Sequence, residues 1–214
     1  MIEQIIDDAR DWARGRMWIP RAVLLLYLVY ADYRLFSDPE SSTMFSGITL
    51  AVHELGHVIF GFAGHFIGSL MGSGTQVLVP IIVMILFLRQ RDYFAISVGA
   101  FWLSFSLFEL ARYVGDARSM DLPLVGLSSD PEHDWHYLLG ATHMLPLDTT
   151  FAFLIRVLAF CIGAASLVFA VWLLNEMRKP KRVPKPLTRS SRVGVRGQIT
   201  PSEAAQKWDD VTRK

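Results

Sequence analysis

The sequence contains a single cysteine, Cys161, which lies within an apolar run. One cysteine cannot form an intrachain disulfide, and no Cys-x-x-Cys pair is present to bind a metal ion or to exchange electrons. The formal net charge is only +1 at pH 7, so the total charge says nothing about acidic partners. The sequence contains no nucleic-acid-binding motif. These absences exclude a disulfide scaffold and a cysteine metal site, and we expect no nucleic-acid partner.

Charged side chains are also scarce over a long part of the chain. Between Thr43 and Leu88, the only fully charged side chain is that of Glu54. Hydrophobic residues make up 52% of the sequence and are concentrated in long runs, which points to lipid rather than to a soluble core. A helix that crosses a hydrocarbon layer about 30 Å thick needs roughly 20 mostly apolar residues. We therefore predict an all-α fold, a polytopic transmembrane helical bundle with about five to six spans.

Five apolar segments reach or approach the length of a span. They cover residues 17–33, 43–64, 75–88, 93–114 and 151–174. A shorter half-span is predicted at 134–145, and the glycine-rich stretch 65–74 is predicted to be a loop, either re-entrant in the bilayer or exposed to water. No small-residue cleavage site follows the first run, so we interpret that run as a retained span.

Two flanking regions complete the predicted organisation around a membrane domain of residues 17–177. Residues 1–16 are predicted to form an amphipathic helix at the membrane surface. Residues 178–214 are predicted to form a basic tail near anionic lipid headgroups, with a short terminal helix over 201–212 that begins at the cap Thr200.

The basic residues at both ends of the chain predict its orientation. Cytoplasmic flanks are enriched in lysine and arginine, so both ends are predicted to be cytoplasmic, which requires an even number of spans. With six spans, Arg89 and Arg91 would lie on the opposite side, against the same rule. A bacterial inner membrane is the default location for an integral, multi-pass protein with these flanks.

The second apolar run contains the motif His53-Glu54-Leu55-Gly56-His57. Histidines four residues apart project from one face of a helix, so His53 and His57 can direct their imidazoles at a single ion. Glu54 would lie beside that ion, where it could take a proton from a metal-bound water. A chance match would bury a carboxylate and two imidazoles in hydrocarbon at a cost of several kcal/mol, so the apolar context favours a real metal site.

This motif resembles the first motif of the site-2 protease family, the intramembrane zinc metalloproteases that cleave transmembrane substrates, including the glycine before the second histidine. The family's third zinc ligand is an aspartate in a later segment, typically within Leu-Asp-Gly. The best match here is His133-Asp134-Trp135, so the resemblance implies Asp134 as the third ligand. Trp135 stands where the family has glycine, and the family's Asn-x-x-Pro element is absent because Asn175 is the only asparagine. The resemblance covers about residues 43–147.

Judged from the residues alone, the third ligand stays open. His133, Asp134 and His136 lie within four residues just before an apolar run, and any of them could complete the site. Asp134 could instead cap the helix that follows, since aspartate is a favoured cap. Asp116 is a further candidate ligand, although an ion pair with Arg118 is the favoured interpretation.

Four other residues carry expectations for packing. Gly56 leaves room for the close approach of another helix. Gln76, at the start of an apolar run, could hold a substrate backbone or an oxyanion, but an interhelical hydrogen bond is favoured. His65 and His143 are expected to be hydrogen-bonded packing residues rather than ligands.

The sequence thus predicts a zinc-dependent intramembrane or membrane-embedded metallopeptidase. Its Zn2+ would be bound by His53, His57 and Asp134, and Glu54 would activate water for attack on a peptide carbonyl. Expected partners are membrane lipids and a transmembrane or membrane-associated protein substrate, with the oligomeric state open. The alternative is a non-proteolytic membrane protein with a structural or transport metal site. A histidine-rich oxygenase with two irons is disfavoured, because such sites need more ligands than the six histidines present.

Overall fold

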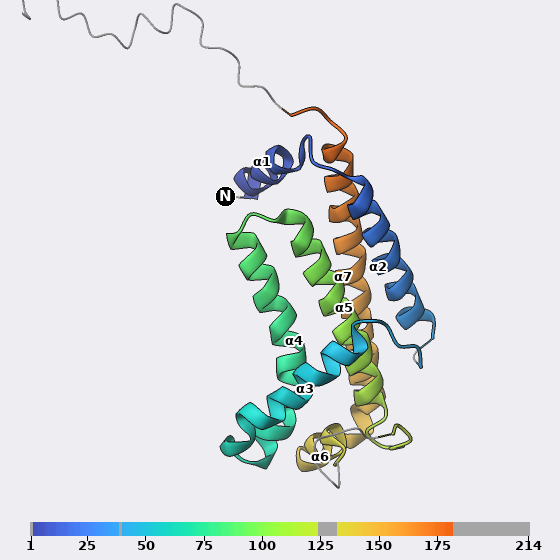
Figure 1. Cartoon of the computed structure of the whole chain (residues 1–214). Helices are drawn as coiled ribbons and strands as arrows, with labels where there is room; N and C mark the ends of the chain where they lie inside the picture. Colours follow the sequence, from blue (N-terminus) through green and yellow to red (C-terminus); the bar gives the residue numbers. More distant parts are fainter. Residues whose placement is uncertain (1, 39, 124–131, 182–214) are drawn as a thin grey trace, which may run out of the picture. The chain divides into compact units, whose positions relative to one another are not determined.

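The computed structural model describes residues 2–38, 40–123 and 132–181, and throughout these ranges the regular structure is helical (Figure 1). The elements, in chain order, are α1 (Ile2–Ala13), α2 (Ile19–Ser37), α3 (Ser46–Phe60), η1 (Gly61–Ala63), α4 (His65–Arg89), α5 (Tyr93–Gly115), α6 (Asp134–Ala141), η2 (Leu145–Leu147) and α7 (Asp148–Met177). The described part of the chain has no strand, and the all-α prediction is confirmed there.

Four of the described segments are long and apolar enough to cross a membrane. They are Ser46–Ala63, His65–Arg89, Tyr93–Gly115 and Leu145–Met177. The predicted runs at 93–114 and 151–174 correspond to α5 and α7. The predicted first span corresponds to α2, which is less apolar because Arg21, Asp32 and Arg34 interrupt it. The length and apolar composition of these four segments are those of membrane-spanning helices, which is consistent with a membrane protein.

The bundle is built around α5, which packs against α2, α4 and α7. Phe101 and Phe105 of α5 are almost fully buried, together with Leu28 of α2 and Leu173 of α7. Large apolar side chains on the outer faces of the other helices are exposed, as they would be in a bundle surrounded by hydrocarbon. Burial is therefore concentrated on α5, and the other helices form a shell around it.

The prediction of a loop at 65–74 is wrong. These residues are helical and form the first turns of α4, which continues unbroken to Arg89. A Cβ atom on Gly72 would lie 2.5 Å from Nε2 of His57, and one on Gly68 would lie 3.5 Å from Cα of Gly61. The glycines here permit close packing of α4 against the preceding helix rather than a turn.

The predicted half-span at 134–145 is also shorter than expected. Helix α6 has eight residues and ends at Ala141, and His143, two residues later, adopts a left-handed backbone with φ of 58°. A residue in that conformation cannot continue a right-handed helix, so the chain turns here before α7 begins. α6 is not among the segments long enough to span.

The N-terminal flank forms α1, whose Ala9 and Ala13 are buried while most of its charged residues are exposed. The backbone N–H of Gly15 donates to the carbonyl of Lys179 at 3.0 Å, which joins the α1–α2 linker to the end of α7. The membrane-surface position of residues 1–16 stays a prediction. The predicted tail beyond residue 181, with Thr200 and the helix at 201–212, lies outside the described residues.

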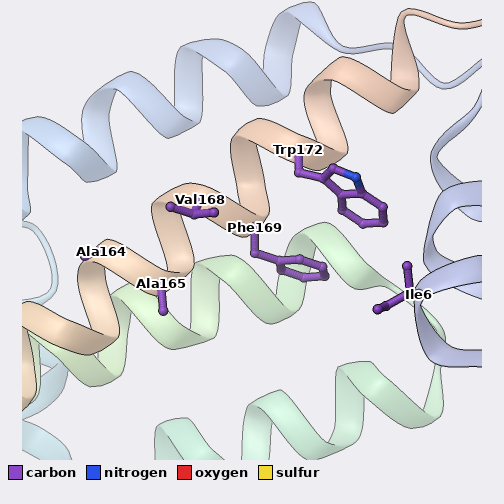
Figure 2. A pocket seen from close by; sticks show the side chains of 6 residues that line it. All are labelled: Ile6, Ala164, Ala165, Val168, Phe169 and Trp172. Atoms are coloured by element: carbon purple, nitrogen blue, oxygen red, sulfur yellow. The ribbon is translucent and has the colours of Figure 1, made fainter. Parts of the chain in front are cut away.

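A hollow between α1 and α7 is lined by apolar side chains alone (Figure 2). Its lining residues are Ile6, Ala164, Ala165, Val168, Phe169 and Trp172. None of these side chains can bind a metal ion or transfer a proton, so the hollow is not a candidate catalytic site.

Candidate metal centre

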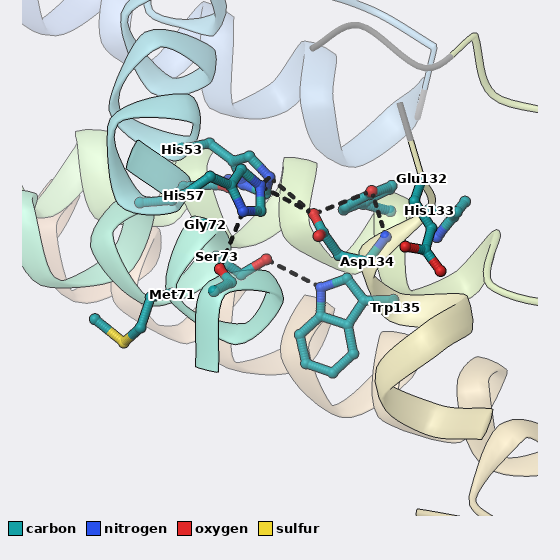
Figure 3. A network of polar contacts seen from close by, with 12 residues as sticks. His53, His57, Met71, Gly72, Ser73, Glu132, His133, Asp134 and Trp135 are labelled. Carbon is teal, nitrogen blue, oxygen red and sulfur yellow. Dashed lines mark hydrogen bonds and ion pairs between the residues drawn. The ribbon is translucent and has the colours of Figure 1, made fainter. Parts of the chain in front are cut away.

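Three side chains from two helices converge beside the second half of α3 (Figure 3). His53 and His57 project from one face of α3, and Asp134 is the first residue of α6. Nε2 of His53 lies 3.0 Å from Nε2 of His57, and each of these nitrogens lies 3.2 Å from Oδ2 of Asp134. These three residues form a group that could hold a metal ion.

The spacing of the three atoms suits a tetrahedral ion. Nitrogen and oxygen ligands about 2.0–2.1 Å from a tetrahedral ion lie about 3.3–3.4 Å from one another. The observed separations of 3.0 and 3.2 Å are only slightly shorter, so a small outward shift of the side chains would admit an ion. Three ligands on one side of the ion would leave the fourth position open.

The other nitrogen of each imidazole is held by a fixed acceptor. Nδ1 of His57 lies 3.0 Å from the carbonyl of Gly68, which can only accept a hydrogen bond. Nδ1 of His53 lies 3.1 Å from Oε1 of Gln76, whose amide nitrogen donates to the carbonyl of Ser106 at 2.9 Å. That second bond fixes which way the Gln76 amide faces. In neutral imidazoles each Nδ1 therefore carries the proton, and each Nε2 presents a lone pair to the group.

The atoms that meet at the centre are therefore all hydrogen-bond acceptors. Two nitrogen lone pairs and a carboxylate oxygen face one another, with no hydrogen to share unless an imidazole takes up a second proton. The side chains of His53 and Asp134 are each 9% exposed, so water screens this repulsion poorly. A bound cation relieves it, and the 29% exposure of His57 leaves an approach to the group.

Asp134 is placed by α6 and by Tyr113 of α5. The hydroxyl of Tyr113 donates to Oδ2 of Asp134 at 3.3 Å and accepts from its backbone N–H at 3.0 Å. Burial raises the pKa of Asp134, but the two imidazoles beside it, which donate to the carboxylate when protonated, outweigh burial and lower the pKa to about 2. The side chain is therefore an ionised carboxylate at neutral pH, the form that binds a metal.

The interpretation of Asp134 as a helix cap is wrong. The N-cap of α6 is His133, whose Nδ1 accepts from the backbone N–H of His136 at 3.2 Å. Because Nδ1 of His133 is an acceptor, its Nε2 carries the proton and faces Oδ2 of Asp116 at 3.3 Å. Both nitrogens of His133 are thus engaged away from the group, and the side chain of Asp134 is left to face the histidines.

The other candidate ligands also have different partners. Nδ1 of His136 donates to the carbonyl of Ala117 at 2.7 Å. Asp116 accepts from the Ser119 hydroxyl at 2.7 Å and from the backbone N–H of Asp121 at 2.9 Å. Neither residue belongs to the metal-binding group found among the described residues.

The prediction that Asp116 forms an ion pair with Arg118 is wrong. Arg118 pairs instead with the buried Asp148 at the start of α7, at 2.8 Å. Burial raises the pKa of Asp116, but its hydrogen bonds from the Ser119 hydroxyl and two backbone N–H groups outweigh burial and leave the pKa below its ordinary value. Burial lowers the pKa of His133, and this outweighs the attraction of Asp116.

Glu54 lies next to His53 on α3 and is partly buried. It interacts electrostatically with His57 and with Tyr113. It is not a member of the metal-binding group. Its place beside the ligands rather than among them is what a general base requires.

Several residues around the centre were not predicted from the sequence. Nothing in the sequence around Tyr113 indicates a role at the metal centre. Trp135 stands out in the sequence only because the family has glycine at that position. The Trp135 indole N–H donates to the Ser73 hydroxyl at 3.0 Å and joins α6 to α4. Gly68 and Gly72, four residues apart, form a small-xxx-small pattern that could have predicted the helix contact at the histidines.

Gln76 makes the interhelical hydrogen bonds that the sequence favoured, and Gly56 lies where α4 approaches most closely. His65 pairs with Glu132 at 2.9 Å and stacks on Tyr137, away from the ligand group. No protein-family model, curated protein or solved structure matches this chain. The resemblance to the site-2 proteases therefore rests on the residues of the motif.

Proposed function

We propose that this chain is a zinc-dependent metallopeptidase embedded in a membrane, with Zn2+ held by His53, His57 and Asp134. The observation that carries the proposal is the convergence of two imidazole lone pairs and one carboxylate oxygen at separations close to a tetrahedral edge. Two histidines and one carboxylate, with an open fourth position, are a ligand set used by catalytic zinc sites in peptidases. Each imidazole is also held through its second nitrogen, as ligating histidines usually are.

The residues around the ligands suit hydrolysis of a peptide bond. When bound, zinc would polarise the scissile carbonyl and lower the pKa of a water molecule. Glu54 would then accept a proton from the attacking water and pass it to the leaving amine. Tyr113 keeps the Asp134 carboxylate directed at the histidines through its two hydrogen bonds. Gln76 and the Gly68 carbonyl keep the imidazoles in the tautomer that leaves Nε2 free to ligate.

The setting of the centre supports a substrate from the membrane. α3 and α4, which surround the histidines, are long and apolar enough to lie in a bilayer. A substrate that reaches Glu54 would therefore be a transmembrane or membrane-associated protein, and lipids would surround the enzyme. We place the protein in a bacterial inner membrane, on the basis of its basic flanks.

Metal analysis tests the ligand set. Detergent-purified wild type should contain about one zinc per chain, the stoichiometry of a catalytic site with three protein ligands. His57→Ala and Asp134→Ala should lose it. His133→Ala is the matched control, since His133 adjoins a ligand but directs both nitrogens elsewhere. No zinc in gently purified wild type, or loss of zinc only in His133→Ala, would overturn the ligand assignment.

Glu54→Gln tests the reaction. This variant should keep its zinc, because Glu54 is outside the ligand group, and should lose cleavage of a membrane-protein substrate by at least 100-fold, as expected for removal of a general base. Full cleavage by Glu54→Gln would contradict the mechanism.

A second candidate function is a structural or transport metal site without proteolysis. The low exposure of His53 and Asp134 favours it, because structural ions are usually enclosed. In that case Glu54→Gln would retain both zinc and function. The 29% exposure of His57 and the charge of Glu54 beside it favour the peptidase.

A further inference from the structure

Contacts between the helices divide the bundle into two ends. At the first end, the Trp12 ring packs against Tyr93 at 5.8 Å, and Arg178 lies over the Trp18 ring at 4.4 Å. Arg91, in the α4–α5 turn, lies 3.9 Å from Asp8 of α1. The start of α2, the α4–α5 turn and the end of α7 therefore share this end with α1, as Figure 1 also shows.

The metal centre lies toward the opposite end. Asp134 is hydrogen-bonded to Tyr113, which is two residues before the end of α5. At 1.5 Å per residue, Tyr113 is about 30 Å along the helix axis from Tyr93 at the first end. That distance is close to the thickness of the hydrocarbon layer, so the centre lies near the opposite membrane boundary.

Helix α3 covers only the half of the bundle nearest that boundary. The ring of Phe45, just before α3, lies 5.3 Å from the ring of Phe105, in the middle of α5. The Trp102 indole N–H, one turn earlier on α5, donates to Thr49 at 3.2 Å. From this level α3 runs toward the end of α5, where the ring of His53 lies 5.9 Å from the ring of Tyr113. Although long enough to span, it begins at mid-depth.

The chain both enters and leaves α3 on the same half of the bundle. The preceding helix, α2, ends with Phe36 against Phe108 at 6.2 Å, beyond the middle of α5. The following helix, α4, starts beside the end of α3, where His57 contacts Gly68 at 3.0 Å. Among the described helices, only α2, α4, α5 and α7 then cross from one end to the other. These four crossings are an even number, as the sequence required for both chain ends to share a side.

With six spans, Arg89 and Arg91 would have been on the extracytoplasmic side, against the rule that basic residues favour the cytoplasmic flanks. The topology removes this conflict, because the α4–α5 turn that carries Arg91 lies at the first end with α1. Most lysine and arginine residues in the described part of the chain gather at this end. They are Arg10, Arg14, Arg16, Arg21, Arg89, Arg91, Arg178, Lys179 and Lys181, while Arg34, Arg112, Arg118 and Arg156 lie toward the other end. Arg112 and Arg118 there are paired with Glu40 and Asp148. The first end is therefore the cytoplasmic one.

We propose that the metal centre opens on the extracytoplasmic side of the membrane and acts on the extracytoplasmic segment of a membrane protein adjoining its span. The orientation stands on the topology alone, whereas the substrate class rests on the proposed peptidase function. Apolar side chains at the α3–α4 tip, among them Phe62 and Phe66, are exposed and suit the membrane boundary. A substrate anchored in the same bilayer presents its first residues outside the hydrocarbon at this depth.

Cysteine labelling tests the orientation without depending on activity. In a full-length Cys161→Ala background, which removes the native thiol, single cysteines are introduced at exposed positions of each end. Asp121→Cys and Thr150→Cys report the metal-centre end, and Gln90→Cys and Lys181→Cys report the basic end. With a membrane-impermeant maleimide on intact bacterial spheroplasts, the first pair should be labelled, and the second pair only after permeabilisation. The reverse pattern would overturn the orientation.

Paired model substrates test the substrate class. One single-span protein carries a test peptide next to its span on the outer side, and a second carries the same peptide on the inner side. Wild type should cleave the outer-side protein alone, and Glu54→Gln neither. Cleavage of the inner-side protein alone would overturn the inference while keeping the peptidase. If labelling is as expected and neither protein is cleaved, the orientation stands, and the peptidase and its substrate class are rejected.

Discussion

The orientation of His53 depends on a single amide. Gln76 accepts from Nδ1 of His53 and is itself held by the Ser106 carbonyl, both in buried surroundings. In Gln76→Leu the imidazole loses its acceptor and is no longer held in the ligating orientation. We expect the affinity for zinc to fall roughly 10- to 100-fold, the usual cost of losing such a partner. Competition with a chelating dye on detergent-purified protein measures this.

Gln90→Leu is the matched control, because Gln90 is an exposed residue after the end of α4. It should bind zinc with the affinity of wild type. If Gln76→Leu did the same, the amide would have no part in presenting His53, and the tautomer argument for the metal centre would fail.

Tyr113 is the corresponding support for Asp134. Tyr113→Phe removes the hydroxyl that donates to the carboxylate and accepts from the backbone N–H of the same residue. A hydrogen bond to a charged group contributes about 1.5–3 kcal/mol, so we expect zinc affinity to fall by roughly 10-fold or more, with helical content unchanged by circular dichroism. Tyr33→Phe, at a residue 63% exposed on α2, should have no effect. Equal affinities for the two variants would show that Asp134 is oriented by α6 alone.

The sequence predicts local relations between residues far better than distant ones. The pairing of His53 and His57 follows from helical spacing, and the structure has both on one face of α3. The partners of Asp116 and Arg118 could not be derived this way. Two neighbouring opposite charges suggested an ion pair, but the partner of Arg118 is Asp148, thirty residues away. Only the packing of α5, α6 and α7 brings those side chains together.

At the scale of elements, hydrophobic runs predicted α5 and α7 to within a few residues, because a run of that length in lipid has few structures other than a helix. The same reasoning failed at 65–74. The loop prediction treats these glycines as residues that let the backbone turn. In α4 they matter because they have no side chain, which allows another helix to pack closely. Composition alone cannot distinguish these uses, because the difference lies in what packs against the glycine.

The contact between α3 and α4 gives a prediction for stability. A Cβ atom on Gly56 would overlap the carbonyl oxygen of Met71, which belongs to the helical backbone and cannot turn aside. In Gly56→Ala the two helices must separate. We expect a loss of about 1–3 kcal/mol in unfolding free energy, the usual cost of overpacking, seen as a lower melting temperature in detergent.

Gly47→Ala provides the control within the same helix. An added Cβ at Gly47 meets nothing within 4 Å, and alanine favours a helix by up to about 1 kcal/mol over glycine. Its melting temperature should equal or exceed that of wild type. A Gly56→Ala protein as stable as Gly47→Ala would mean that α3 and α4 are not packed as closely as described.

For the molecule as a whole, the metal would act as a cross-link between α3 and α6. α6 packs on α4 and α5, and Asp134 is its contact with the histidines of α3. Zinc that binds only the folded protein at 100 times its dissociation constant stabilises that protein by about 2.7 kcal/mol. For a chain of this size, each kcal/mol corresponds to about 2–4 °C, so a chelator should lower the melting temperature of wild type by about 5–10 °C.

Two variants make this shift diagnostic of the centre. His57→Ala lacks a ligand, so its melting temperature should be the same with zinc and with chelator. Glu54→Gln should show the full shift of wild type, because a general base contributes to the reaction and not to holding the ion. Loss of the shift in Glu54→Gln would make Glu54 a ligand, and its absence in wild type would show that no ion joins α3 to α6. A full shift in Glu54→Gln together with lost cleavage is the result that separates a catalytic zinc from a structural one.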